Sequence, residues 1–410
     1  MWNLIKAYLG IRTVRSSICE GNRTEKWLTD IKFVEDELPK RHKNLFFELS
    51  EASFYRQIKH IRSNIENLSD DEIKVLLFEL VAGIKDGHSV LYLKHKNQYP
   101  LRFYYFDDGI YLTQSTDEYA EFIGSELIAI GGHDITEVAN RLTKCVSADN
   151  HQQFKNRFSN YLVVPEILKG LGLANDQAEF TFKNDRQIFS IILEPCPIDT
   201  LELKLISNML HLSNQTKNYW YQLNNKENYV YFQYNSCMKD NTQSFKAFNK
   251  EMFQAIDKNN IQQIIVDMRH NGGGASWIIN PFFRALRKRP HLNNPKKLFV
   301  IIGRQTFSSA LMNTIRFMKK TNATLAGEET GGAPNGYGEI MFLKLMNANI
   351  QVVYSTQYFK QLDEELNCIE PAIKVPNLSK NYFEDRDCVL IEIEKAIKSR
   401  DTEEIKEYTN

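Results

Sequence analysis

The chain has 410 residues, of which 42% are hydrophobic and 25% are charged, and its 51 Lys and Arg residues balance its 51 Asp and Glu residues. This length predicts two or three domains rather than one continuous core. The balanced charge gives no reason to expect nucleic acid or an anionic membrane as a partner.

The sequence lacks the usual marks of secretion, membrane insertion and metal binding. Residues 1–11 are mildly apolar, but Lys6 interrupts them and no small-residue cleavage site follows, so we expect no signal peptide. No stretch has the roughly 18–20 apolar residues that a membrane span requires. The six cysteines are scattered without a CxxC pair, which is typical of a reducing compartment and not of a disulfide scaffold or zinc ribbon. We therefore expect a cytoplasmic protein without a metal or cofactor.

Residues 24–92 are predicted to be helical. Ser69-Asp70-Asp71-Glu72 forms a capping box, which marks a helix N-terminus. The helix is expected to end near Gly87, which suits a C-terminal cap, so His88 should lie just past a helix end. Apolar residues within this helix recur with a period of about 3.6 residues: Ile73, Leu76, Leu77, Leu80, Val81 and Ile84.

Residues 98–196 change to short alternating strands with two helical stretches, which predicts a separate α+β module. A hairpin is expected across Asn184-Asp185. Residues 197–225 are polar and are expected to link the two halves of the chain. The predicted strands cover 102–106, 109–114, 125–130, 179–182 and 188–193, and the predicted helices cover 135–142 and 166–171.

From about residue 226 strands and helices alternate, which predicts a mostly parallel sheet flanked by helices. In such sheets functional sites gather at the carboxyl ends of the strands. Two turns rich in glycine or serine lie at such ends, one over 267–274 and one over 303–310. The predicted strands cover 229–232, 264–267, 298–302 and 323–326, and the predicted helices cover 242–258, 276–286 and 308–319.

These two turns indicate acyl transfer with a serine nucleophile. Glycines allow backbone N–H groups to approach a substrate, and a serine at a strand-to-helix turn can present its hydroxyl. We expect Asp267 and Arg269 to hold the first turn in place rather than to take part in the chemistry. His270, which could act as a second base, is expected to be exposed.

Four motifs occur in one order: D-G-H at 86–88, D-x-R-x-N-x-G-G at 267–274, T-F-S-S-A at 306–310 and G-E-x-T-G-G-x-P-N at 327–335. Together they resemble the S41 serine peptidases, which include the tail-specific (C-terminal processing) proteases and the tricorn core proteases. The resemblance covers nearly the whole chain and is closer to the tricorn-type branch. It implies a peptidase that acts on peptides or unfolded proteins.

The same resemblance implies a domain organisation. A helical N-terminal region would cover residues 1–96 and end in the D-G-H motif. A small, degenerate PDZ-like α+β module would cover residues 97–200. An α/β catalytic domain of the crotonase/ClpP-like spiral type would cover residues 201–410.

The resemblance places the nucleophile at Ser308. The family often has a glutamate three residues after the nucleophile, and Leu311 occupies that position here. The oxyanion hole would then come from the backbone N–H groups of Gly273 and Ser309. An ordinary helix N-cap is the alternative interpretation of Ser308, because serine favours that position.

The identity of the general base separates the two branches of the family. The processing proteases use a lysine where this chain has Ala333, and a methyl group cannot accept a proton. Lys319 and Lys320 lie about three helical turns beyond Ser308, which is too far to replace it. The tricorn branch uses a histidine, in a motif that His88 matches, and an imidazole can take a serine proton near neutral pH. A capping or core histidine is the alternative interpretation of His88.

A histidine base also needs an acid to orient it. In the tricorn branch this acid precedes a G-V-x-P-D-I strand. Aligning Ile369 and Pro371 with that strand places Glu365 at the acid position. Glu364 and Glu370 remain alternatives, and a surface glutamate is the other interpretation of Glu365.

Two other functions remain open on the sequence alone. The same scaffold serves as a non-catalytic ligand carrier in retinoid-binding relatives, so a weakly active or inactive protein that binds a peptide or another ligand is one alternative. Ala333 and Leu311 favour it. A crotonase-type acyl-CoA enzyme is the second alternative, but it would not explain the Ser308 turn or the D-G-H motif.

Overall fold

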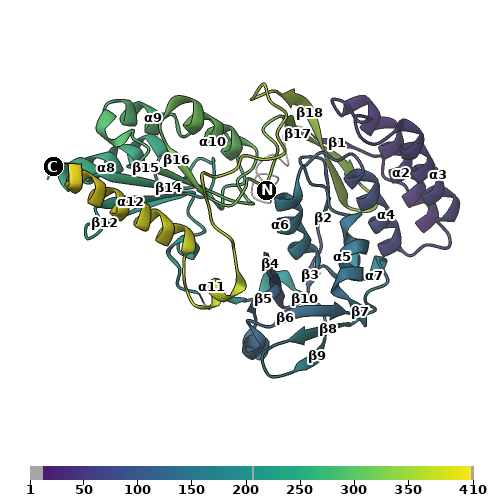
Figure 1. Cartoon of the computed structure of the whole chain (residues 1–410). Coiled ribbons are helices and arrows are strands. Elements are labelled where there is room, and N and C mark those ends of the chain that lie inside the picture. The colour runs from purple at the N-terminus through teal and green to yellow at the C-terminus, as the bar shows by residue number, and fades with distance from the viewer. Residues whose placement is uncertain (1–12, 206, 408–410) are drawn as a thin grey trace. The chain divides into compact units, whose positions relative to one another are not determined.

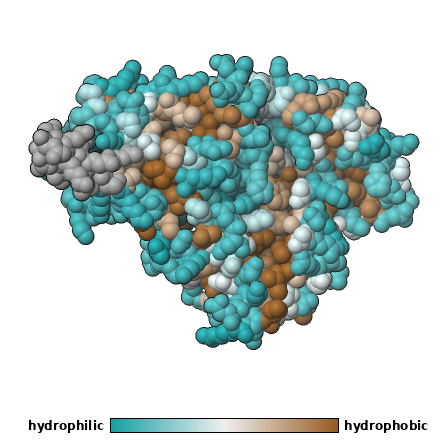
Figure 2. Space-filling view, in the orientation of Figure 1, coloured by the Kyte–Doolittle hydropathy of each residue, from teal (hydrophilic) through white to brown (hydrophobic). Residues whose placement is uncertain are grey.

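The computed structural model describes residues 13–205 and 207–407, and these residues form two compact units (Figure 1). We call them the six-stranded unit, with residues 207–334 and 361–407, and the three-sheet unit, with residues 13–205 and 335–360. The segment examined for a signal peptide, residues 1–11, lies outside the described residues. No helix in the described ranges combines the length and the apolar composition that a bilayer span requires. Polar residues cover much of the face shown in Figure 2, with hydrophobic patches between them.

The six-stranded unit contains the predicted, mostly parallel sheet. Its strand order is β12-β13-β14-β15-β16-β19, in which all neighbours are parallel except the antiparallel pair β12–β13. The strands are β12 (Tyr219–Asn224), β13 (Tyr229–Tyr234), β14 (Gln263–Asp267), β15 (Leu298–Ile302), β16 (Thr324–Gly327) and β19 (Ile373–Lys374). Residues 197–225, which were expected to link the two halves of the chain, also contribute β12 to this sheet.

Helices cover both faces of this sheet. On β14, Ile264 and Val266 belong to one hydrophobic core, and Ile265 belongs to the core on the opposite face. Burial on both faces explains why the parallel strands are almost continuously apolar. The helices are α8 (Phe245–Lys258), α9 (Asn280–Arg287), α10 (Ser309–Lys320), α11 (Ser379–Phe383) and α12 (Cys388–Glu407). Residues of α8, α9 and α10 belong to the first core, and residues of α12 belong to the second.

The three-sheet unit combines N-terminal helices with three sheets. A seven-stranded sheet has the order β11-β5-β6-β8-β9, with β4 paired to β5 and β7 paired to β6, and a four-stranded sheet has the order β1-β17-β18-β2. The small third sheet pairs β10 with β3. Its strands are β1 (Thr13–Arg15), β2 (Val90–Leu93), β3 (Asn97–Gln98), β4 (Leu101–Phe106), β5 (Gly109–Ser115), β6 (Glu126–Ile130), β7 (His133–Asp134), β8 (Ala178–Lys183), β9 (Ile188–Leu193), β10 (Cys196–Pro197), β11 (Lys204–Leu205), β17 (Gly336–Leu345) and β18 (Ile350–Phe359).

The described residues of this unit form six α-helices. They are α2 (Arg23–Arg41), α3 (Glu51–Asn64), α4 (Asp70–Ala82), α5 (Ile135–Thr143), α6 (His151–Tyr161) and α7 (Pro165–Gly170). The predicted capping box is present, because Ser69 Oγ accepts from the Glu72 N–H and Glu72 accepts from the Ser69 N–H. The predicted end of α4 was wrong. The helix stops at Ala82 with Gly83 as its C-cap, so Gly87 caps no helix.

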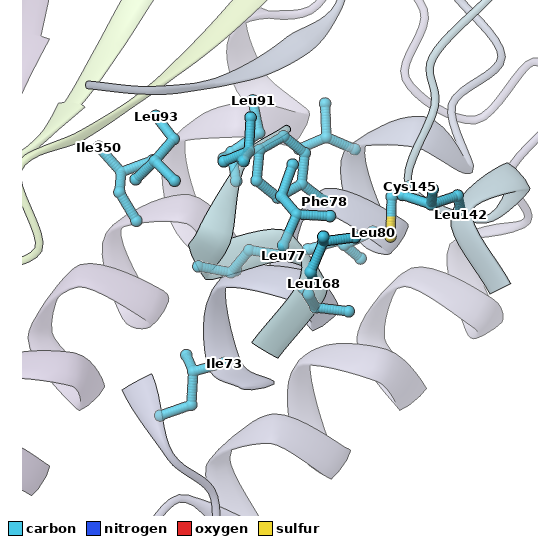
Figure 3. Close-up of a cluster of buried hydrophobic side chains, with 14 of the residues drawn as sticks. Ile73, Leu77, Phe78, Leu80, Leu91, Leu93, Leu142, Cys145, Leu168 and Ile350 are labelled. Atoms are coloured by element: carbon cyan, nitrogen blue, oxygen red, sulfur yellow. The ribbon is translucent and has the colours of Figure 1, made fainter. Parts of the chain in front are cut away.

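A hydrophobic core fixes α4 against β2 and therefore places the loop between them. Figure 3 shows Leu77, Phe78 and Leu80 of α4 together with Leu91 of β2 and Leu168 of α7. All five side chains are buried. The D-G-H segment thus connects two elements that share one rigid core.

Candidate active site

Ser308 lies between β15 and α10 in a strained backbone conformation. Its φ of 53° and ψ of −126° fall in the left-handed half of conformational space, which residues other than glycine rarely adopt. Its side chain makes no capping hydrogen bond to α10. The geometry therefore does not support the interpretation of Ser308 as an ordinary N-cap. A strained serine at a strand-to-helix turn is the arrangement that presents a nucleophilic hydroxyl.

The neighbouring Ser309 has a different environment. Its side chain is buried, and its Oγ donates a hydrogen bond to the Gly274 carbonyl oxygen at 2.6 Å. This bond ties the first turn of α10 to the glycine-rich turn after β14. The Ser309 hydroxyl thus has a structural partner, whereas Ser308 is only partly buried at the turn itself.

The glycine-rich turn lies directly against Ser308. Gly273 has a φ of 110°, and a Cβ added to it would lie 2.8 Å from Ser308 Cβ and 3.0 Å from the Ser309 nitrogen. Only glycine fits at this position. The Gly273 N–H donates to Asn271 Oδ1 at 2.9 Å, and Asn271 Nδ2 donates to the Tyr234 carbonyl at 2.8 Å. The Gly273 N–H is therefore already bonded within its own turn.

A buried ion cluster holds the start of this turn. The Arg269 N–H donates to Asp267 Oδ1 at 2.9 Å, and the Arg269 guanidinium makes a bidentate pair with Asp387 at 2.9 and 3.1 Å. Tyr231 Oη donates to Asp267 Oδ2 at 2.5 Å. Burial raises the pKa of Asp387, but the charge of Arg269 and the nearby His211 outweigh it and lower this pKa to about 2. These contacts agree with a positioning function for Asp267 and Arg269.

His270 is not the exposed side chain that the sequence suggested. It is half-buried, and its Nε2 lies 2.9 Å from Nδ1 of His211, which is buried. Burial lowers the pKa of His270 to about 4. The expectation failed because His211, 59 residues earlier in the chain, folds onto the turn.

In the three-sheet unit, a buried carboxylate organises the D-G-H segment. Asp86 accepts hydrogen bonds from the His88 N–H at 2.8 Å and from Ser89 Oγ at 2.6 Å, and His42 Nε2 lies 3.2 Å from its Oδ2. Burial raises the pKa of Asp86, but the bonds from His42 and Ser89 and the charge of His88 outweigh it and lower this pKa to about 2. Asp86 thus remains ionised and fixes the backbone of His88.

Helix α6 and the residues just before it hold Gly87 from the other side. The Gly87 N–H donates to Asp149 Oδ1 at 2.5 Å, and Arg157 donates to the Gly87 carbonyl at 2.6 Å. A Cβ at Gly87 would lie 2.4 Å from Gln153 Oε1. A larger residue at position 87 would therefore displace the side chains of Gln153 and Asp149. Asp149 and Arg157 had no signal in the sequence, because these contacts span 62 and 70 residues.

The His88 ring is half-buried and lies near β17, with its Cε1 3.7 Å from the position of a Cβ at Gly338. Burial lowers the pKa of His88 to about 4, while the charge of Asp86 raises it and the charge of Arg157 lowers it. The imidazole is therefore neutral at physiological pH. A neutral imidazole can accept a proton.

The three candidate acids lie in one segment of the six-stranded unit. Glu364, Glu365 and Glu370 are all exposed. The segment is anchored by Ile369, which exchanges backbone and side-chain hydrogen bonds with Thr330 at 2.9 and 3.1 Å. No contact of Glu365 distinguishes it from the other two, so the acid is not identified by this geometry.

The structure brings some of the predicted residues together and leaves others apart. Ser308, Ser309 and Gly273 form one site in the six-stranded unit. His88 belongs to the three-sheet unit, so its pairing with Ser308 stays a prediction. Lys319 lies eleven residues along α10 from Ser308, about 16 Å at 1.5 Å per residue, and donates to the Gln361 carbonyl at 2.7 Å. Within the described ranges, no group of three His, Cys, Asp or Glu side chains is arranged to hold a metal ion.

Comparison with solved structures supports the fold. The chain is similar to mature CPAF, both alone (TM-score 0.66, 12% identity) and complexed with lactacystin (TM-score 0.66, 11% identity), and each match covers 92% of this chain and 98% of the other. The tricorn protease also matches, at 13% identity and a TM-score of 0.43, over 92% of this chain and 37% of that one. A structure described as a putative S41 protease from Bacteroides fragilis matches at 12% identity and a TM-score of 0.39, over 77% of this chain and 87% of that one. No model of a protein family matches the sequence, and no curated protein matches it. At these identities the likeness shows a shared mixed α/β fold.

Proposed function

We propose that this chain is a serine peptidase of the S41 type, closer to the tricorn branch, that hydrolyses peptides or unfolded proteins. Ser308 is the nucleophile, His88 the general base and Glu365 the orienting acid. The observation that carries the proposal is the strained turn of Ser308, packed against a glycine-rich turn and free of any capping bond. The fold shared with mature CPAF supports it.

The chemistry follows from these positions. Ser308 Oγ attacks the peptide carbonyl while His88 takes its proton, and His88 then returns the proton to the leaving amine. Water hydrolyses the resulting acyl-enzyme by the same steps in reverse order. The N–H groups of Ser309 and Gly273 stabilise the oxyanion. To do so, the Gly273 N–H has to break its hydrogen bond to Asn271 Oδ1 and donate to the substrate oxygen instead.

The proposal includes the organisation and location of the protein. We assign a helical N-terminal region to residues 1–96, a degenerate PDZ-like module to 97–200 and a catalytic domain of the crotonase-like spiral type to 201–410, from which β17 and β18 pair with β1 and β2 of the N-terminal region. We also assign the protein to the cytoplasm. Its partners are peptide or protein substrates, without nucleic acid or membrane.

A fluorophosphonate probe tests the nucleophile directly. We expect the probe to modify Ser308 in the folded full-length chain, because only an activated serine reacts with it. Mass spectrometry of the digested protein would identify the labelled residue, and heat-denatured protein provides the control for non-specific labelling. A folded protein that resists the probe and cleaves no unstructured protein would instead favour the ligand-binding alternative.

The substitution Gly273→Ala tests the oxyanion site. The added Cβ would meet Ser308 Cβ at 2.8 Å and force a non-glycine residue to a φ of 110°. We expect kcat to fall by about 100-fold or more, which is the usual loss when one oxyanion donor is displaced. Peptide hydrolysis under saturating substrate would measure it.

Gly303→Ala is the matched control for this substitution. It follows β15 directly, and its Cβ would make only ordinary contacts, 3.4 Å from Arg269 Cβ and 3.7 Å from Glu328 Oε2. We expect it to retain most of the activity. Equal losses in both variants would contradict a special function of Gly273.

A further inference from the structure

Strand β9 is an open edge of the seven-stranded sheet. It pairs with β8 over its full length, from Ala178↔Leu193 to Lys183↔Ile188, without a register shift. No strand of the described residues pairs with its other side. Natural proteins commonly protect such edges with proline, a bulge or a lysine within the strand. The sequence Ile188–Leu193 has none of these devices.

The outward face of β9 is apolar although it is exposed. Alternate residues of a strand share a face. Ile188 is 64% exposed and Ile192 is 65% exposed, with the exposed Ser190 between them, while Phe189 and Ile191 face the core of the unit. Figure 2 shows hydrophobic residues on the lower part of the surface. Strands β8 and β9 lie in this part of the molecule in the same orientation (Figure 1). An open edge with two exposed isoleucines is suited to pairing with another strand.

The sequence around this edge is self-complementary. Ile188 and Ile192 lie two residues before and after Ser190, and Arg186 and Glu194 lie four residues before and after it. In an antiparallel pair of two identical strands centred on Ser190, each Ile188 faces the other chain's Ile192. Arg186 lies in the hairpin turn before β9 and Glu194 directly follows β9, so the turn end of each chain then lies beside the end of the other chain that carries Glu194.

The charges of this hairpin favour the same arrangement. Lys183 and Arg186 lie at the turn end, and Glu179 and Glu194 lie at the open end, all of them exposed. Within the chain, Glu194 accepts a hydrogen bond from the side-chain amide of Gln177 at 2.8 Å. This amide is neutral, so it does not neutralise the negative charge of Glu194. An antiparallel pair brings the basic end of one hairpin to the acidic end of the other. A parallel pair would instead bring like charges together.

We propose that β9 is a self-association edge, at which two copies of this chain pair their β9 strands antiparallel about a two-fold axis at Ser190. The contact is isologous, as closed two-fold dimers require. Main-chain hydrogen bonds join the two sheets, and the isoleucine pairs cover each other on the outer face. This dimer does not depend on the proposed peptidase activity.

Sedimentation velocity of the full-length chain over a dilution series tests the proposal. We expect a monomer–dimer equilibrium whose dissociation constant rises by about tenfold or more in Ile192→Lys, because the two-fold axis doubles the effect of each substitution. Ile18→Lys is the matched control, since Ile18 is 71% exposed but lies outside every strand. It should leave the equilibrium unchanged. Circular dichroism would verify that both variants are folded.

A charge exchange tests the register. Glu194→Lys should weaken the dimer, because the new ammonium group would lie against Arg186 of the other copy, and the double variant Arg186→Glu with Glu194→Lys should restore it. A monomer at every concentration would overturn the proposal. So would a dimer that Ile192→Lys leaves intact, or one that the double variant fails to restore. A monomer whose β9 binds an added extended peptide would assign the edge to a peptide partner instead.

Discussion

Ser308→Ala is expected to lower peptide hydrolysis by on the order of 10⁴-fold or more while the protein stays folded. The substitution removes a single oxygen from a side chain that makes no capping bond, so little stability depends on it. Alanine and serine both carry a Cβ, so the substitution leaves the cost of the positive φ at position 308 unchanged. The turn should therefore keep its shape. Steady-state kinetics on an unstructured peptide, with thermal unfolding of both proteins, would measure activity and stability together.

Ser309→Ala is the companion variant and should have the opposite profile. The Ser309 hydroxyl bonds to the Gly274 carbonyl in a buried position, so its loss should cost about 1 kcal/mol of stability. Its backbone N–H remains in place, so activity should fall only modestly. An inactive Ser309→Ala beside an active Ser308→Ala would move the nucleophile by one residue and contradict the assignment.

The pH dependence of hydrolysis should reveal a base with a lowered pKa. Burial lowers the pKa of His88 to about 4. His88 can take the Ser308 proton only when it is neutral, so activity is present above this pKa and is lost as the pH falls through it. The acid limb of kcat/KM should therefore have its midpoint at about pH 4, well below the ordinary histidine value of about 6.5. His88→Ala should lower the rate about a thousandfold or more, because one member of a triad is removed.

Unfolding at low pH has to be separated from titration of the base. The pKa values of His211 and His270 are also lowered by burial. A histidine with a lowered pKa in the folded state binds its proton more readily when unfolded, so stability decreases as the pH falls below about 6.5. Circular dichroism at each pH would show where the fold is lost. Equal rates in wild type and His88→Ala would eliminate His88 as the base.

Much of the fold could be predicted from local patterns. The capping box at Ser69, the hairpin between β8 and β9 and the alternation of strands and helices after residue 226 all depend on neighbours in sequence, and all are present in the structure. The strand at Leu298–Ile302 was predicted with its observed bounds. The turn at Ser308 was predicted for the same reason, since a buried apolar strand is followed within a few residues by the serine pair that begins a helix.

Several predicted features failed where distant residues compete with local signals. Gly87 resembled a helix cap, but α4 ends at Ala82 with Gly83 as its cap, and Gly87 instead lies against the side chains of Gln153 and Asp149. His270 was expected to be exposed, and His211 half-buries it. The N–H of the predicted oxyanion glycine, Gly273, has a bond within its own turn that the sequence did not indicate.

The sequence by itself determined the identity of the chemical groups and two local turns: a serine at a strand-to-helix turn, a glycine-rich turn after the neighbouring strand and a histidine in a D-G-H motif. These features depend on backbone conformation and short-range hydrogen bonds, which a few adjacent residues dictate. Only the tertiary structure decided that β17 and β18, at residues 336–359, leave the six-stranded unit to pair with β1 and β2. It alone decided that Arg157 and Asp149 hold Gly87, and that Asp387 holds Arg269. These side-chain contacts join residues that lie 62 to 118 positions apart, and the strand pairs join residues still farther apart, such as Thr13 and Phe342. Their free energy comes from burial of whole elements, which no local pattern encodes.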